Sequence, residues 1–265
     1  MTPDACDAPA ERHIPDERDP TDALAPLYDG ARALGLVLDD RQLALFLRYR
    51  DELLDWNTRV NLTAITDPAQ VLTRHFLDAL TVVLALSPEE RARPARVLDV
   101  GAGAGLPGLA LKIALPHWSV TELDSVGKKT LFVEHVVETL GLCAAGDAVA
   151  LTGRAEDLAR SQGRRERYDY VLARALAPLR VLAEYTLPFC RAGGLVIAMK
   201  KGDIRTEVTE GRRAVGQVGG KVERLIPVPP LPDLGDDRVL VPLRKIRPTP
   251  PEFPRAPGMP AKRPL

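Results

Sequence analysis

The stretch RVLDVGAGAGLPG, residues 96–108, decides the fold of this chain. Its first five residues predict a short, mostly apolar strand, and the glycine-rich turn that follows leads into a helical stretch over residues 107–115. Glycines in such a turn let the chain turn tightly and let a ligand approach the backbone beside the positive end of a helix. The turn therefore predicts a binding site at the carboxyl end of this strand.

The spacing of the glycines indicates which ligand the turn would hold. Gly101, Gly103 and Gly105 follow the pattern G-x-G-x-G, whereas the dinucleotide fingerprint is G-x-G-x-x-G. Asp99 precedes them, and a nearby carboxylate suits a sulfonium amino acid better than a pyrophosphate. Asp124 ends the next predicted strand, 23 residues after Gly101, where a carboxylate can bind a ribose diol. The glycine turn and Asp124 together predict a nucleoside cofactor. The alternative is that the turn is a tight strand-to-helix connection without a ligand and that Asp124 is a solvated acid at a strand end.

Strands and helices alternate along the chain after this turn. The predicted strands are residues 96–100, 119–123, 148–151, 168–172 and 194–199, and the predicted helices between them are residues 107–115, 126–140 and 177–190. Such alternation predicts an α/β fold with a mostly parallel sheet and helices on both faces. Residues 221–228 and 238–246 predict an antiparallel hairpin at the edge of the sheet.

Composition divides the chain into four expected segments. Two helical stretches, residues 40–56 and 67–83, precede the first strand. The expected segments are a disordered acidic extension over residues 1–22, a helical cap over 23–88, an α/β core over 89–247 and a basic, proline-rich tail over 248–265.

Composition also excludes several classes of protein. The chain has 265 residues, of which 45% are hydrophobic and 27% charged, so it can bury a sizeable core. No apolar run approaches the roughly 18 residues of a membrane span, and the acidic N-terminus is unlike a signal peptide. Its three cysteines are widely spaced and its four histidines do not cluster with them. We therefore expect a cytoplasmic protein with neither a disulfide nor a metal.

The charges balance over the whole chain but not at its ends. Lys plus Arg and Asp plus Glu both number 36, whereas residues 1–22 carry a charge of −5 and residues 244–265 a charge of +5. The last 18 residues contain seven prolines, which predict an extended tail without regular secondary structure. An extended basic tail favours binding of a polyanion such as RNA. Its deletion is then expected to weaken RNA binding while cofactor binding survives.

Taken together, these motifs resemble the class I, Rossmann-like S-adenosylmethionine-dependent methyltransferases. Within them the chain is similar to the RsmG (GidB) family, bacterial methyltransferases of small-subunit ribosomal RNA. The resemblance covers roughly residues 40–265. It rests on residues 57–63 (NTRVNLT), 74–78 (RHFLD), 99–108 (DVGAGAGLPG), 123–125 (LDS), 127–129 (GKK), 154–157 (RAED), 173–175 (ARA), 198–200 (AMK) and 249–258 (TPPEFPRAPG). The chain departs from the family at Ala79, where serine is frequent, and in its acidic N-terminal extension.

The resemblance implies methylation of N7 of one guanosine in the 530-loop region of 16S rRNA, on the naked RNA or the small ribosomal subunit. It places cofactor contacts at Gly101, Leu106, Ala155, Glu156 and Arg174, with Asp124 and Ser125 at the ribose end. From the glycine turn we add Asp99, Gly103 and Gly105 to the candidates. No membrane and no stable protein partner is expected, and we expect a monomer.

The residues after the fourth predicted strand fit a ring nitrogen as methyl acceptor. N7 carries a free lone pair and needs no general base, so catalysis can rest on orientation, which contributes up to ~7–11 kcal/mol. Methylation of an exocyclic amine usually uses an Asn/Asp-Pro-Pro-aromatic loop, but this chain has Ala173-Arg174-Ala175-Leu176 there. Methylation of a pyrimidine C5 needs a cysteine nucleophile, and neither Cys143 nor Cys190 follows this strand. Arg174 follows the fourth predicted strand, at the carboxyl end where ligands of open α/β sheets bind, and is the candidate catalytic residue through orientation.

Basic residues are the candidate RNA contacts, and each of them has an alternative role in which it does not touch RNA. Arg74 can pair with Asp78 four residues on, which would make Arg74-His75 a structural polar patch, and isolated lysines are usually solvated. The RNA candidates are Arg74, His75, Lys128, Lys129, Lys200, Arg255, Lys262 and Arg263. Three other functions stay open from the residues alone: a small-molecule methyltransferase, an NAD-binding protein, and a catalytically silent RNA-binding module.

Overall fold

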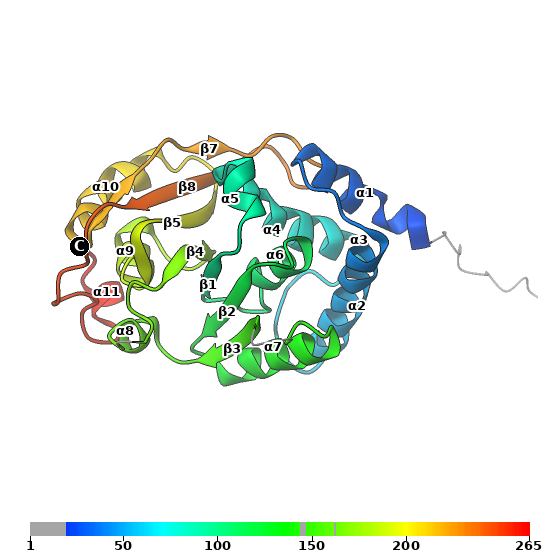
Figure 1. Cartoon of the computed structure of the whole chain (residues 1–265), viewed down its shortest axis with the longest axis horizontal. Coiled ribbons are helices and arrows are strands. Elements are labelled where there is room, and N and C mark those ends of the chain that lie inside the picture. The colour runs from blue at the N-terminus through cyan, green and yellow to red at the C-terminus, as the bar shows by residue number, and fades with distance from the viewer. Residues whose placement is uncertain (1–19, 144–146, 162) are drawn as a thin grey trace, which may run out of the picture.

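The computed structural model describes residues 20–143, 147–161 and 163–265. A central sheet is flanked by helices on both faces, with the N-terminal helices gathered on one side of the molecule and the C-terminal segment on the other (Figure 1). The strands are β1 Arg96–Val100, β2 Ser119–Asp124, β3 Ala148–Thr152, β4 Tyr168–Arg174, β5 Cys190–Lys201, β6 Gly220–Val222, β7 Ile226–Pro227 and β8 Arg238–Lys245.

The helices precede, connect and follow these strands. Before the sheet come α1 Pro20–Ala33, α2 Asp40–Asn57, α3 Pro68–Val71, the π-helix η1 Leu72–Leu77, α4 Asp78–Leu80, the 3-10 helix η2 Thr81–Ala85 and α5 Pro88–Ala92. Within and after it come α6 Gly108–Ala114, α7 Gly127–Thr139, α8 Ala155–Leu158, α9 Leu179–Thr186, α10 Arg205–Gln217 and α11 Met259–Lys262. In the described part of the chain, none of these helices has the length and apolarity needed to span a bilayer.

The strand order is β3-β2-β1-β4-β5-β8-β6, with β7 paired to β8. Strands β1 to β5 pair in parallel, and β8 is antiparallel to β5. The predicted α/β fold is therefore confirmed. The predicted hairpin differs in detail, because its first half divides into β6 and β7, which both pair with β8, and β8 lies inside the sheet rather than at its edge.

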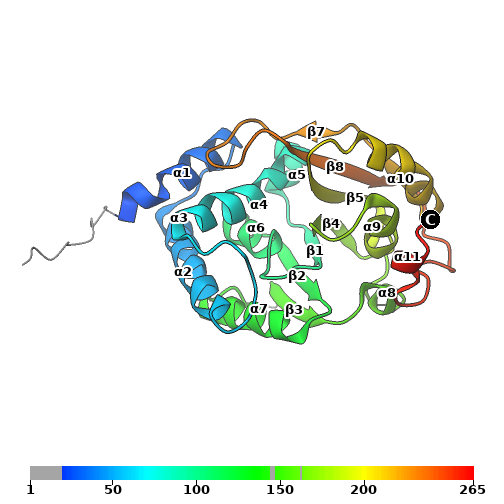
Figure 2. The ribbon, with the colours of Figure 1, turned by 180° about the vertical axis from the view of Figure 1, so that it is seen from behind.

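Each face of the sheet packs against its own set of helices. On one face, residues such as Val97 join Phe46 and Phe76 of the N-terminal helices in one apolar cluster, together with α6 and α7. On the other face, residues such as Leu98 pack against α9 and α10 (Figure 2). This alternation follows from the two-residue side-chain period of a strand. The N-terminal helices therefore share a core with the sheet.

Two features of the N-terminal region differ from expectation. Helix α1 begins at Pro20, inside the segment expected to be disordered, of which residues 1–19 lie outside the described part. Pro26 and Gly30 obscure the helical pattern of α1, yet Leu27 is fully buried and Gly30 packs against Leu77. The expected helix over residues 67–83 is one α-turn, a π-helix, a short α-helix and a 3-10 helix in succession.

The C-terminal tail is not extended into solvent as expected. It returns over α8 and α9, and residues 259–262 form the short helix α11 (Figure 1). Proline supplies carbonyls but no N–H group, so the tail needs donors from elsewhere. Arg165 supplies them, with Nη1 2.9 Å from Phe253 O and Nη2 2.9 Å from Thr249 O.

Candidate functional site

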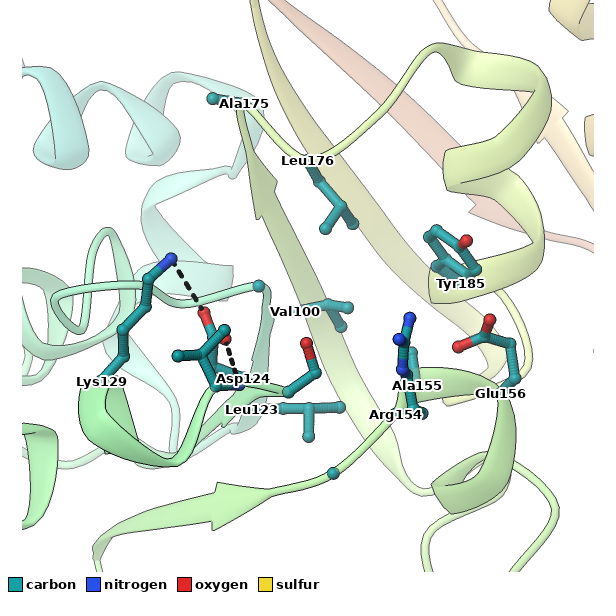
Figure 3. A pocket seen from close by; sticks show the side chains of 14 residues that line it. Val100, Leu123, Asp124, Lys129, Arg154, Ala155, Glu156, Ala175, Leu176 and Tyr185 are labelled. Atoms are coloured by element: carbon teal, nitrogen blue, oxygen red, sulfur yellow. Dashed lines mark hydrogen bonds and ion pairs between the residues drawn. The ribbon is translucent and has the colours of Figure 1, made fainter. Parts of the chain in front are cut away.

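A pocket of about 310 Å³ opens at the carboxyl ends of β1, β2 and β4, where the strand order reverses (Figure 3). Ligands of open α/β sheets bind at this position. The pocket is lined by Val100, Gly101, Leu123, Asp124, Ser125, Val126, Lys129, Gly153, Arg154, Ala155, Glu156, Ala175, Leu176 and Tyr185.

The glycine turn forms the floor of the pocket at Gly101. This residue has φ +75°, and a Cβ added to it would lie 2.6 Å from Leu176 Cδ1. Its N–H donates to the carbonyl of Leu123 at 2.8 Å, which holds the turn against β2. Any other residue would be strained at this φ and its Cβ would collide with Leu176, so only glycine fits here and the pocket meets bare main chain.

Asp124 forms one wall. Its Oδ2 accepts from the N–H of Gly103 at 3.0 Å, and its Oδ1 accepts from the N–H of Val126 at 2.8 Å. Lys129 Nζ lies 3.9 Å from Oδ2, on the pocket side of α7 (Figure 3). Two backbone hydrogen bonds thus hold the carboxylate at the end of β2, in a position to accept ribose hydroxyls.

The opposite wall consists of Arg154, Glu156 and Tyr185, from the start of α8 and from α9 (Figure 3). Glu156 is 2% exposed, and its Oε1 accepts from the N–H of Gly258 in the tail at 2.9 Å. Burial, followed by the nearby Glu156 carboxylate, raises the pKa of Tyr185. The phenol therefore stays protonated and can donate a hydrogen bond into the pocket.

Beneath the turn lie two fully buried acids, Asp99 and Glu122. Asp99 Oδ2 accepts from the N–H of Gly108 at 2.9 Å, whereas the other oxygen of Asp99 and both oxygens of Glu122 have no hydrogen-bond donor among the described residues. Burial raises the pKa of Asp99 to about 7 and, with repulsion from Asp99, raises that of Glu122 well above its ordinary value. Such a pair of adjacent carboxyls is stable in the core only if protons are retained. Asp99 therefore supports the turn from below and does not line the pocket.

Arg174 ends β4 beside the pocket, next to the lining residues Ala175 and Leu176. Its Nη1 lies 3.4 Å from Oδ2 of Asp78, and the Nε of Arg238 lies 2.5 Å from the other oxygen, Oδ1. Asp78 thus pairs with two arginines from the sheet and not with Arg74, because its carboxylate is buried toward the strand ends while Arg74 faces solvent. The alternative of an Arg74–Asp78 pair was wrong.

The π-helix holds His75 against the loop that precedes α3. His75 Nε2 lies 2.6 Å from Thr63 Oγ1, and Asn57 fixes the same loop by accepting from the N–H groups of Leu62 and Thr63 at 2.9 Å each. Burial and the nearby Arg174 lower the pKa of His75 to about 4. The ring is therefore neutral at pH 7 and contributes hydrogen bonds without charge. Insertions of π-helix are frequent at functional sites.

The candidate cofactor residues fall into two groups. Gly101, Asp124, Ser125, Ala155 and Glu156 line the pocket together. The remaining candidates, which adjoin or support the pocket without lining it, are Asp99, Gly103, Gly105, Leu106 and Arg174.

The candidate RNA contacts are spread over several surfaces. Lys129 lines the pocket, Lys200 is engaged by Glu207 at 2.7 Å, and Arg255 pairs with the buried Glu184 at 2.8 Å. His75 is partly buried as described above. The exposed members of the set are Arg74, Lys128, Lys262 and Arg263.

Sequence reasoning missed several residues of the site. Arg154 and Tyr185 line the pocket, Leu176 closes it above Gly101, and Gly258 reaches Glu156 from the tail. Arg154 stood within the quoted motif RAED and could have been included for that reason. Tyr185 and Gly258 carry no local signal, because their roles depend on contacts between distant segments.

The strand order with an antiparallel β8 beside β5, and a pocket between an acid at the end of β2 and an acid on α8, define a Rossmann-like class I methyltransferase. The fold agrees with a solved chain from the complex of the Haloferax volcanii Trm112 methyltransferase activator with a methyltransferase. That chain has a TM-score of 0.51 and 14% identity, over 74% of this chain and 98% of its own length.

The chain belongs to the family of rRNA small subunit methyltransferase G, GidB, which matches residues 42–228. It is 47% identical to "Ribosomal RNA small subunit methyltransferase G" of Roseiflexus sp. (strain RS-1) over 90% of this chain and 98% of that protein. It is 45% identical to the protein of the same description from Dehalococcoides mccartyi (strain CBDB1), again over 90% and 98%. The resemblance deduced from the sequence is thereby confirmed. The protein is a methyltransferase of small-subunit rRNA with S-adenosylmethionine as cofactor.

Proposed function

We propose that this protein transfers a methyl group to N7 of one guanosine in the 530-loop region of 16S rRNA, and that the pocket between Asp124 and Glu156 holds the cofactor. The observation that carries the proposal is the placement of these two acids on opposite walls of one pocket, with the glycine floor between them. This order matches a nucleoside with its ribose toward β2 and its base toward α8.

The residues present fit S-adenosylmethionine. At Gly101 the floor of the pocket is bare main chain, and a side chain there is excluded because its Cβ would collide with Leu176. Glu156 offers a buried acceptor for an exocyclic amino group, and Asp124 offers oxygens for a ribose diol. A volume of about 310 Å³ lies at the lower end of the usual range for small-molecule sites.

We assign distinct roles to the candidate cofactor residues. Gly101, Asp124, Ser125, Ala155 and Glu156 contact the cofactor directly. The supporting residues Asp99, Gly103, Gly105 and Leu106 hold the turn in shape: Asp99 binds the N–H of Gly108, and Gly103 orients Asp124.

The mechanism is one of orientation. S-adenosylmethionine, when bound, supplies the electrophilic methyl group. Arg174 is held at the end of β4 by Asp78 and fixes the acceptor base in line with the pocket. Ala175, with φ +51°, turns the chain sharply after Arg174, in a left-handed conformation that is strained for a residue other than glycine. Correct alignment of reacting groups contributes up to ~7–11 kcal/mol to the barrier reduction.

The side chains around the pocket support a ring nitrogen as acceptor. Cys190 is fully buried, and burial raises the pKa of its thiol to about 12, so it is no nucleophile at neutral pH. Cys143 lies beyond the end of α7 and does not line the pocket. The lone pair of guanine N7 needs neither a thiolate nor a base.

The RNA is proposed to bind across the pocket mouth. Lys128 and Lys129 lie on α7, which lines the pocket through Lys129, and Arg74 is exposed on η1 next to His75, which contacts the neighbouring loop. Lys262 and Arg263 are proposed as peripheral phosphate contacts, whereas Lys200 is engaged by Glu207 and Arg255 by Glu184. The protein is further proposed to be a cytoplasmic monomer, organised as a helical cap that begins with α1 at Pro20 rather than at residue 23, a core (89–247) and a tail (248–265).

Methyl transfer tests the proposal directly. The protein is mixed with methyl-labelled S-adenosylmethionine and with unmodified 16S rRNA or small subunits, and the RNA is digested to nucleosides. We expect label in 7-methylguanosine only. Label in another nucleoside would refute the assigned acceptor atom, and absence of label on both RNA forms would refute the assigned substrate.

A further inference from the structure

The C-terminal tail contacts the wall of the pocket through Glu156. The N–H of Gly258 donates to Glu156 Oε1 at 2.9 Å, across a separation of 102 residues. Glu156 is 2% exposed and lines the pocket. One oxygen of a pocket carboxylate is therefore already bound by the tail, which fixes the rotation of the whole group.

A second contact fixes the tail to α9. The backbone N–H of Arg255 donates to Glu184 Oε1 at 2.5 Å. The guanidinium of Arg255 donates to the same carboxylate, with Nη2 2.8 Å from Oε2. Glu184 is fully buried, and its neighbour Tyr185 lines the pocket. A bidentate Arg–carboxylate pair has a defined geometry, so it locks the tail to the helix that carries Tyr185.

Arginines of the core hold the tail along the rest of its length. Arg165 donates to the carbonyls of Thr249 at 2.9 Å, Pro250 at 3.1 Å and Phe253 at 2.9 Å, and Arg160 donates to that of Pro254. These donors fix the path of the segment that ends at Gly258.

We propose that residues 249–258 are a positioning element of the cofactor pocket, which orients the Glu156 carboxylate to accept a hydrogen bond from the exocyclic amino group of adenine. This inference rests on the proposed function, since it takes the pocket as the S-adenosylmethionine site. An oriented carboxylate attracts the amino group of adenine and repels the O6 carbonyl of hypoxanthine. The tail therefore contributes to selection of the base, although no tail residue lines the pocket.

The experiment compares two glycines that share a backbone conformation. Gly258 has φ +79° and Gly141 has φ +65°, and an added Cβ meets nothing within 4 Å at either position. Gly258→Ala and Gly141→Ala introduce the same backbone strain, but only the first displaces the N–H that holds Glu156. Full-length wild type and both variants are titrated calorimetrically with S-adenosylmethionine and with its deaminated analogue, which carries hypoxanthine.

We expect Gly258→Ala to weaken S-adenosylmethionine binding about tenfold and to lower the preference for adenine over hypoxanthine by a similar factor, because a hydrogen bond to a charged group is misplaced. Gly141→Ala should match the wild type with both ligands. Arg255→Ala, as a second variant, should reduce the preference further.

An unchanged preference in both tail variants would overturn the inference, and so would an equal loss of affinity for the two ligands, which is the mark of general loosening. Failure of the wild type to bind S-adenosylmethionine would instead refute the proposed pocket. Normal binding and methylation by the wild type, with unchanged base preference in the variants, would refute the role of the tail alone.

Discussion

Replacement of the buried Glu122 by glutamine should stabilise the protein at neutral pH. Glu122 is fully buried, and neither of its oxygens receives a hydrogen bond from a described residue. Burial, then repulsion from Asp99, raises its pKa well above the ordinary 4.5. The folded protein therefore holds this proton over a pH range in which the unfolded chain has released it. Holding the proton costs about 1.4 kcal/mol for each pH unit by which the pH exceeds 4.5, up to the raised pKa of the folded protein.

Glutamine has the shape of the protonated acid and does not titrate. Glu122→Gln should therefore raise the free energy of unfolding at neutral pH. The gain should grow by up to about 1.4 kcal/mol per pH unit above pH 4.5 and vanish near pH 4.5. The sign follows from proton linkage. A carboxyl group whose pKa is raised by folding destabilises the folded protein increasingly as the pH rises above the pKa of the unfolded chain. His75, whose pKa is lowered to about 4, acts in the opposite direction below pH 6.5, but it is present in both proteins and cancels in the difference.

Urea unfolding at pH 5, 6, 7 and 8, followed by tryptophan fluorescence, measures the effect, because Trp118 is fully buried. Glu138→Gln is the matched control, since Glu138 is exposed on α7 and its loss should change stability by less than about 0.5 kcal/mol. A Glu122→Gln protein that is less stable than wild type at pH 7, or a difference that does not vary with pH, would refute a protonated Glu122.

Three further substitutions test the site and its support. Gly101→Ala places a Cβ 2.6 Å from Leu176 Cδ1, on a residue with φ +75°. Calorimetry should show weaker S-adenosylmethionine binding, and urea unfolding should show a free energy of unfolding lower by about 1–3 kcal/mol. Wild-type affinity in this variant would contradict the assignment of Gly101 to the pocket floor. Arg174→Ala should lower the rate of methyl transfer by on the order of a hundredfold with cofactor binding retained, and an undiminished single-turnover rate would remove it from the mechanism. Arg255→Ala removes the guanidinium that pairs with the buried Glu184 and should lower the free energy of unfolding by about 3–5 kcal/mol. Arg263→Ala, at an exposed position, is the control and should leave stability unchanged. Equal effects of the two substitutions would show that the Arg255–Glu184 pair does not cause the loss of stability.

The arrangement of the tail changes one expectation from the sequence. An extended basic tail would be removable without loss of cofactor binding. Because Gly258 binds Glu156 and Arg255 binds Glu184, deletion of residues 248–265 is now expected to weaken cofactor binding as well. Proline content indicated correctly that most of the tail forms no helix or strand, but it could not indicate that core arginines satisfy the tail's carbonyls.

Asp78 illustrates the same limit. Its sequence neighbour Arg74 suggested a local pair, whereas the partners in the structure are Arg174 and Arg238, 96 and 160 residues away. Glu122 is a second example, because a glutamate in the strand Ser119–Asp124 gives no sign that it will be buried next to Asp99.

The sequence by itself determined the alternation of strands and helices, the glycine turn after β1 and the acid at the end of β2, whereas Glu156 followed only from the family resemblance. These features depend on the local periodicity of apolar residues and on backbone conformations that few residue types can adopt. Each can be recognised within a segment of about 30 residues. Only the tertiary structure decided that Glu156 meets Gly258, that Arg174 and Arg238 share Asp78, and that Asp99 and Glu122 are buried together. Such contacts join segments far apart in sequence, and their free energies depend on burial and on the distance between charges, which exist only once the chain has folded.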